Sequence, residues 1–136
     1  MAANTSPIFV LTPKNSYITT GVSANTALDG TGTVATVYTA GTNGSKIENV
    51  TLWHLGTNIA TVVRFFVNNG STNATAGNNA LVQEFTMAAN TLSQVAASVQ
   101  VVWPSNLYLP NGYKLNVTIG TAIAAGVMVA AQGGDY

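Results

Sequence analysis

Short runs of apolar and β-branched residues, each closed by a cluster of Gly, Asn, Ser or Pro, recur along the whole chain. Residues 33–38 alternate between polar and apolar side chains, which is the two-residue period of a half-buried strand. The turn after them contains Asn43-Gly44, the strongest short hairpin signal. Helical periodicity is nearly absent; only residues 88–97 could form one helical turn.

Comparable runs predict strands at residues 17–22, 33–38, 47–55, 59–67, 80–87, 98–103, 113–119 and 126–131. A spacing of about 8–12 residues between short strands is typical of sandwiches and barrels. We therefore predict an all-β fold, a jelly-roll-like β-sandwich of about eight antiparallel strands. The Asn-rich segment 68–79 is predicted to be a loop, of a length common in functional or disordered segments.

The composition limits the partners that the chain can bind. Only 6% of the 136 residues are charged, and four Lys/Arg balance four Asp/Glu. We expect no nucleic acid and no membrane as partner, because both need clustered cations or a long apolar span. A neutral, weakly charged surface tends to associate, so we expect a homo-oligomer. The start of the chain lacks a secretory signal and cysteine is absent, which predicts synthesis in a reducing cytoplasm.

Length alone predicts one domain. We expect residues 17–136 to form this β-sandwich and residues 1–16 to be an extended N-terminal arm or the first strand. Within the arm, a short apolar run stands between Pro7 and Pro13 and consists of Ile8, Phe9, Val10 and Leu11. Such a run suits strand addition to a neighbouring sheet, and the alternative is an ordinary first strand.

The chain has few side chains that could take part in catalysis or bind a metal. Glu48 and His54 share a predicted strand face but would lie about 20 Å apart, too far to act as a pair. No nucleophile elbow, zinc-protease motif or phosphate loop is present. Asp29 offers calcium only one carboxylate and is interpreted as a turn residue, and one His without Cys excludes a structural zinc site within the chain. We expect no enzyme activity, no cofactor and no metal.

Aromatic side chains and one ion pair remain as candidates. Trp53, Trp103, Tyr108 and Tyr113, with the Asn-rich loops, are the residues that a sugar platform would use. Trp53 shares its predicted face with Ile47 and Leu55, and Trp103 ends a strand, so we favour the core or an interface for both tryptophans. Arg64 and Glu84 stand in neighbouring predicted strands and are expected to form a cross-strand ion pair, or to reach across a subunit interface.

Four segments share motifs with a known class of proteins. Residues 38–47 (YTAGTNGSKI) precede residues 58–68 (NIATVVRFFVN), and residues 107–115 (LYLPNGYKL) and 132–136 (QGGDY) follow in the same order. This series resembles small head decoration (cement) proteins of tailed bacteriophages, from about Val34 to Tyr136. The resemblance implies a jelly-roll-type protein, often trimeric, on the capsid exterior. The first 30 residues match no motif of that class.

The expected function is therefore that of a structural decoration protein, which binds the major capsid protein on the outside of the virion head. It would stabilise the shell through apolar contacts and strand addition, with a homotrimer favoured. Contacts to the capsid or to other subunits are expected at Ile8, Phe9, Val10, Leu11, Trp103 and Tyr136. The alternative is a carbohydrate-binding β-sandwich module of a phage fibre or a cell-surface protein.

Overall fold

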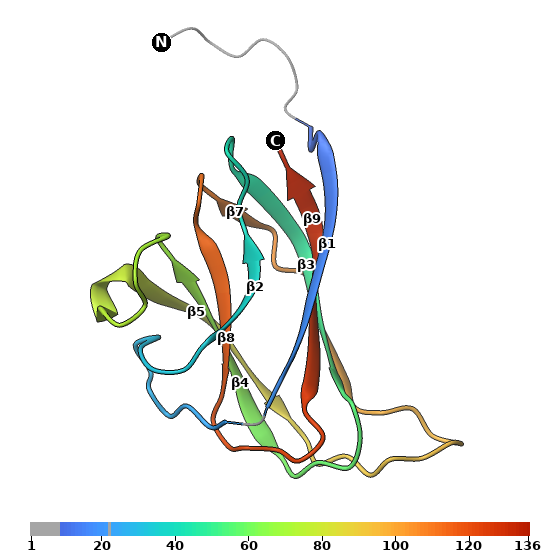
Figure 1. The fold of residues 1–136 in the computed structure, drawn as a ribbon. Coiled ribbons are helices and arrows are strands. Elements are labelled where there is room, and N and C mark those ends of the chain that lie inside the picture. The colour runs from blue at the N-terminus through green and yellow to red at the C-terminus, as the bar shows by residue number, and fades with distance from the viewer. Residues whose placement is uncertain (1–8, 22) are drawn as a thin grey trace, which may run out of the picture.

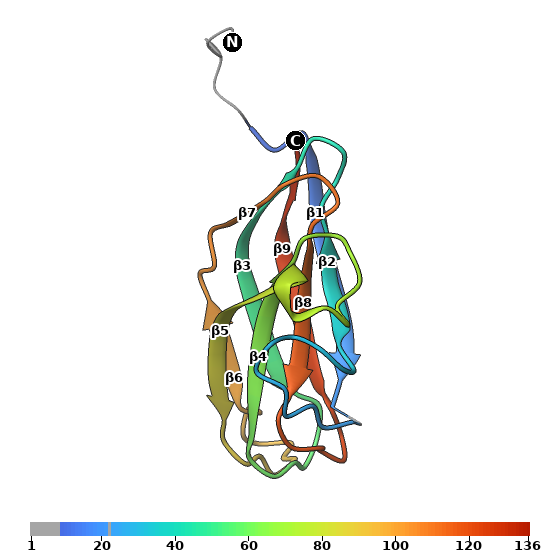
Figure 2. The same cartoon turned by 90° about the vertical axis from the view of Figure 1, so that its left-hand side faces the viewer.

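The computed structural model describes residues 9–21 and 23–136, and Ile8 lies outside them. Figures 1 and 2 show two sheets packed face to face, with the start of β1 and the end of β9 near one end of the sandwich, called here the terminal end. The elements are β1 (Thr12–Thr20), β2 (Ala35–Thr39), β3 (Ser45–His54), β4 (Thr61–Asn68), the 3₁₀ turn η1 (Ala76–Asn78), β5 (Asn79–Met87), β6 (Gln100–Trp103), β7 (Leu107–Leu109), β8 (Lys114–Ile119) and β9 (Val127–Asp135).

The strand order is that of a jelly roll. One sheet has the order β1-β9-β3-β6, with β7 also on β3, and the other has the order β2-β8-β4-β5. All pairs are antiparallel. β6 and β7 pair with successive parts of β3 and act as one strand interrupted at residues 104–106. β1 then pairs with β9, β2 with β8, β3 with the interrupted strand β6–β7, and β4 with β5, as in a long hairpin rolled into two sheets. The predicted fold class is confirmed.

The core fills the space between the two sheets. Inward-facing side chains alternate with outward-facing ones along each strand, as the pleat requires. Phe65 of β4, Leu52 of β3 and Val117 of β8 are fully buried within this core. Arg64 and Glu84 are direct register partners on the outer face, with Nε and Oε1 2.6 Å apart, so the predicted cross-strand ion pair is confirmed.

One predicted face assignment is wrong because β3 contains a bulge. The register between β3 and β9 shifts between Ile47 and Asn49, so Glu48 is an extra residue. An extra residue moves every later side chain to the opposite face. Trp53 is therefore on the outer side of its sheet and only partly buried, while His54 is buried. The core burial expected for Trp53 and the shared face of Glu48 and His54 are both overturned.

The N-terminal region also differs from the expectation. One strand, β1, runs from Thr12 through residue 16 to Thr20 and contains Pro13, instead of a short run ending before Pro13 and a second strand after it. Proline fits here because β1 is an edge strand, where a missing N–H costs no ladder bond on the open side. β1 pairs along its length with β9 of the same chain.

Asparagine side chains order the long loops. Asn73 Nδ2 donates to the carbonyl oxygens of Gly30 (3.3 Å) and Gly32 (2.8 Å), and Asn79 Nδ2 donates to those of Asp29 and Asn73. The loops 21–34 and 69–78 are thereby joined over the outer face of the second sheet. This explains why an Asn-rich segment forms an ordered loop: the amides satisfy backbone carbonyls that no strand pairs.

Candidate functional site

Four of the predicted contact residues lie at the end of the sandwich that carries the chain termini. Phe9, Val10 and Tyr136 line a shallow hollow of about 320 Å³ together with Lys46 and Glu48. Tyr136 and Lys46 also line a neighbouring hollow of about 550 Å³. We call the two together the terminal groove; its residues are Phe9, Val10, Asn43, Lys46, Glu48, Tyr108 and Tyr136.

Three of the seven residues of the terminal groove are aromatic: Phe9, Tyr108 and Tyr136. Phe9 and Tyr108 are exposed, and Leu11 stands exposed just beyond Phe9 and Val10 in the chain. Lys46 Nζ lies 5.8 Å from the ring centroid of Tyr108 and 3.7 Å from Glu48 Oε1. The groove therefore offers aromatic and aliphatic surface with its charges internally balanced, which suits an uncharged partner.

The partly buried carboxylate of Asp135 links neighbouring segments of the chain beneath the groove. Asp135 accepts hydrogen bonds from the Tyr38 hydroxyl (3.1 Å) and the Ser45 hydroxyl. Lys14 Nζ lies 3.6 Å from Asp135 Oδ2 and 4.4 Å from the Tyr38 ring centroid. Burial opposes ionisation of Asp135, but the Ser45 and Tyr38 hydrogen bonds, the Lys14 charge and the Gly41 N–H together hold its pKa below the usual range. Burial raises the pKa of the Tyr38 hydroxyl to about 12.

Two glycines let three strands approach each other at this place. A Cβ on Gly133 would lie 1.9 Å from the Lys46 carbonyl oxygen, and a Cβ on Gly134 would lie 2.0 Å from Val10 Cγ1. The C-terminal Gly-Gly-Asp sequence thus fits β9 between β1 and β3. The Tyr136 N–H then donates to the Gly44 carbonyl (3.1 Å), which ties it to the β2–β3 turn.

Sequence reasoning did not find Asn43, Lys46 and Tyr108 as members of this groove. Lys46 of β3 and Tyr108 of β7 are direct register partners, so the contact depends on strand pairing between distant segments. The Asn43-Gly44 turn was the available signal, because it marks where β3 begins at the same end as the termini.

Trp103 lies away from the terminal groove. It packs with ring-centroid distances of 5.2 Å to Phe65 and 5.9 Å to Phe85, at the margin of the core between β5 and β6. Edge-to-face and tilted pairs of this kind stabilise a core beyond their buried area. The Trp103 indole is therefore partly buried and packs against the core.

His54 is buried and takes part in a hydrogen-bond network. Its Nε2 donates to the Ala88 carbonyl (2.8 Å), while its Nδ1 accepts from Asn58 Nδ2 (2.9 Å). Asn58 Oδ1 accepts the Ala125 N–H at 2.8 Å, which fixes the orientation of this amide and hence the histidine tautomer. Both ring nitrogens are occupied. In the described part of the chain, no three His, Asp or Glu side chains gather as metal ligands.

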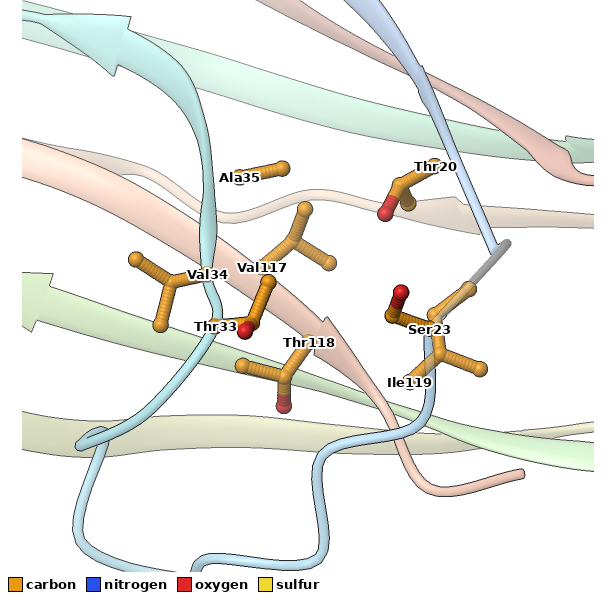
Figure 3. A pocket seen from close by; sticks show the side chains of 8 residues that line it. All are labelled: Thr20, Ser23, Thr33, Val34, Ala35, Val117, Thr118 and Ile119. Atoms are coloured by element: carbon orange, nitrogen blue, oxygen red, sulfur yellow. The ribbon is translucent and has the colours of Figure 1, made fainter. Parts of the chain in front are cut away.

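A small hydroxyl-lined pocket lies between β1, β2 and β8 (Figure 3). Its volume is about 100 Å³, below the roughly 300–1,000 Å³ typical of ligand pockets. Thr118 lines it, and the Thr118 hydroxyl is buried without a hydrogen-bond partner. The space and polarity suit ordered water.

Comparison with known proteins gives little likeness. No family model matches the chain, and no curated protein matches it. Among solved structures, a chain in "Structure of infectious bursal disease virus Gx strain" is 13% identical, with a TM-score of 0.29. The match covers 97% of this chain and 36% of that one, so this chain spans about a third of its length. Within the described residues, no helix is long and apolar enough to cross a membrane.

Proposed function

We propose that this chain is a capsid decoration protein of a tailed bacteriophage, which binds the outside of the head shell through the terminal groove and stabilises it. The observation that carries the proposal is the exposed apolar pair Phe9 and Leu11, set directly before edge strand β1 and beside Tyr136. Exposed apolar side chains grouped at one end of a small domain mark an interaction surface.

The physical character of the groove suits a permanent structural contact. A decoration protein must bind once, tightly and without turnover. Apolar burial and strand addition to the open edge of β1 supply such binding, and salt screens them little. Three of the four motifs that resemble phage decoration proteins, at residues 38–47, 107–115 and 132–136, contribute to this end of the sandwich, including Ser45 and Asp135 beneath the groove. The major capsid protein as partner, the location on the virion and the homotrimer stay predictions.

The test is binding to expanded heads of the encoding phage that lack this protein. Heads are mixed with purified protein, pelleted, and the bound copies counted on gels at low salt and at high salt. We expect the wild type to bind in many copies at both salt concentrations, and the double variant Phe9→Asp/Leu11→Asp to lose about tenfold or more in affinity.

Leu28→Asp is the control, because Leu28 is also an exposed leucine (62% against 78% for Leu11) and lies in the β1–β2 loop, away from the groove. Deletion of residues 1–16 is a poor test, since it would remove the first half of β1 and its pairing with β9. Absence of wild-type binding, or equal binding by the groove variant, would refute the proposal.

A carbohydrate-binding module is the second candidate, and for it we propose the terminal groove, not Trp103, as the binding site. Tyr108 and Tyr136 line one hollow with Asn43 and Lys46, so aromatic faces and polar hydrogen-bonding groups converge. Such a combination can hold a sugar ring. A glycan array with Tyr108→Ala and Trp103→Ala tests it: a sugar signal lost only in Tyr108→Ala supports this candidate, and no signal across the array removes it.

A further inference from the structure

Three loops without any charged residue lie at the end of the sandwich opposite Phe9 and Tyr136. They are residues 55–60, 88–99 and 120–126, at the lower end in Figure 1, and we call them the apolar tip. Leu55, Ile59, Leu92 and Val95 are exposed there, and 98% of the Val95 surface is accessible. Grouped exposed aliphatic residues of this kind mark an interaction surface.

A buried polar network holds the three loops in place. Asn58 pairs with Asn90 through two backbone hydrogen bonds of 2.9 Å. The Asn58 amide also donates to the Gly126 carbonyl (2.9 Å), while the Asn90 amide donates to the Gly56 carbonyl (2.7 Å). A surface fixed by buried hydrogen bonds loses little conformational entropy on binding, so the apolar tip is preorganised.

The apolar tip carries both a protrusion and a hollow. The β5–β6 loop bears Leu92 and Val95 and projects from the sandwich (Figure 1). Next to it, a hollow of about 350 Å³ is lined by residues of all three loops: Thr57, Asn58, Ile59, Ala89, Asn90, Thr91, Ala122 and Ala124. The apolar tip therefore has a protrusion and a hollow, and both consist of uncharged residues.

These features identify the kind of partner. A lipid surface is favoured by Trp, Tyr, Lys or Arg at the contact, and the apolar tip contains none of these residues. Contact between copies of one chain brings like surfaces together, so any charge there would meet a like charge. A surface without charge avoids that repulsion, and the apolar tip offers both a protrusion and a hollow for such a contact.

We propose that the apolar tip binds a second copy of this chain, with the Leu92–Val95 loop of one copy entering the hollow of the other. None of the three loops contains a charged residue; Lys14, Lys46 and Asp135 are at the terminal end, and Arg64, which lies beside Gly120, is paired with Glu84. The molecule thus has two separate contact surfaces, the terminal groove and the apolar tip. Self-association is measured without heads, so its outcome is independent of the shell partner.

Analytical ultracentrifugation of the full chain over micromolar concentrations tests the proposal. We expect the wild type to associate, and Val95→Asp and Leu92→Asp each to raise the dissociation constant about tenfold or more. Leu28→Asp is the control, because Leu28 is also a loop leucine, 62% exposed against 56% for Leu92, and it lies outside the apolar tip. Circular dichroism confirms that the variants fold. A monomeric wild type, or variants that associate as the wild type does, would overturn the proposal.

The absence of cysteine permits a second, direct measurement. Val95→Cys and Ala124→Cys are made as separate proteins, mixed and oxidised gently. We expect a disulfide-linked pair that contains one copy of each, because Val95 of one molecule meets Ala124 of another. Leu28→Cys mixed with Ala124→Cys serves as the control. Equal cross-linking in both mixtures would overturn the proposed contact even if the chain associates.

Discussion

Removal of the Asn58 side chain is expected to destabilise the whole sandwich, because three loops depend on it. Asn58 is buried, and its amide makes three hydrogen bonds: to the Gly126 carbonyl, to His54 Nδ1 and from the Ala125 N–H, all at 2.8–2.9 Å. Asn58→Ala leaves these partners buried and unpaired.

The expected magnitude follows from those three bonds. A lost hydrogen bond that leaves a buried partner unsatisfied costs about 1 kcal/mol or somewhat more, so three cost about 3 kcal/mol. For a domain of this size the midpoint of thermal unfolding should fall by about 10 °C. The cost is a large share of the stability of a small domain, about 5–15 kcal/mol.

Urea denaturation followed by tryptophan fluorescence measures this loss, because Trp53 and Trp103 report on the first sheet. The control is Asn15→Ala, the same substitution on the exposed face of β1, for which we expect a change within about 0.5 kcal/mol. The denaturant slope should be unchanged, as for a pure stability effect. A loss below about 1 kcal/mol for Asn58→Ala would refute the reasoning that the network carries the loops.

Three further predictions follow from other parts of the structure. Gly133→Ala should cost about 2–3 kcal/mol of unfolding free energy, because its Cβ would meet the Lys46 carbonyl at 1.9 Å; Gly77→Ala, with open space around it, should cost almost nothing in the same urea titration. The lowered pKa of Asp135 contributes stability that is present above the unfolded-state pKa near 3.8 and is lost as the pH falls through the lower folded-state value. Asp135→Asn should remove that contribution from the pH dependence measured by chemical denaturation, and an unchanged acid profile would contradict it. Trp103→Ala should lower the free energy of unfolding by about 3 kcal/mol by emptying the aromatic cluster at the core margin, with a loss below 1 kcal/mol contradicting the packing role.

Much of the fold could be predicted because local pattern and tertiary structure agree. The alternation in residues 33–38 and the Gly/Asn turns mark strand ends, and Arg64 and Glu84 pair as their positions across a hairpin predict. Face assignments failed where the ladder is irregular. A bulge at Glu48 reverses the parity of β3, and no residue within β3 predicts it. The bulge lies next to Gly133 of β9, a residue far away in the sequence whose Cβ would meet the Lys46 carbonyl.

Strand boundaries failed for a similar reason. Pro13 predicts a strand end when only its missing N–H is considered, but the edge position of β1 makes that N–H unnecessary. Phe9, Val10 and Tyr136, predicted as contact residues, do lie together, while their contact role stays a prediction. Lys46 and Tyr108 join them only through the pairing of β3 with β7. Residues far apart in sequence that meet through strand pairing leave no local signal.

The pairing of the first strand with the last has a consequence for how the protein is made. β1 pairs with β9 from Thr12 opposite Asp135 to Thr20 opposite Val127, so β1 has no strand partner until nearly the whole chain has left the ribosome. Long-range pairing of this kind slows folding and exposes strand edges meanwhile. We expect nascent chains stalled before β9 to be sensitive to protease, and protection to arise in a single late step once β9 emerges.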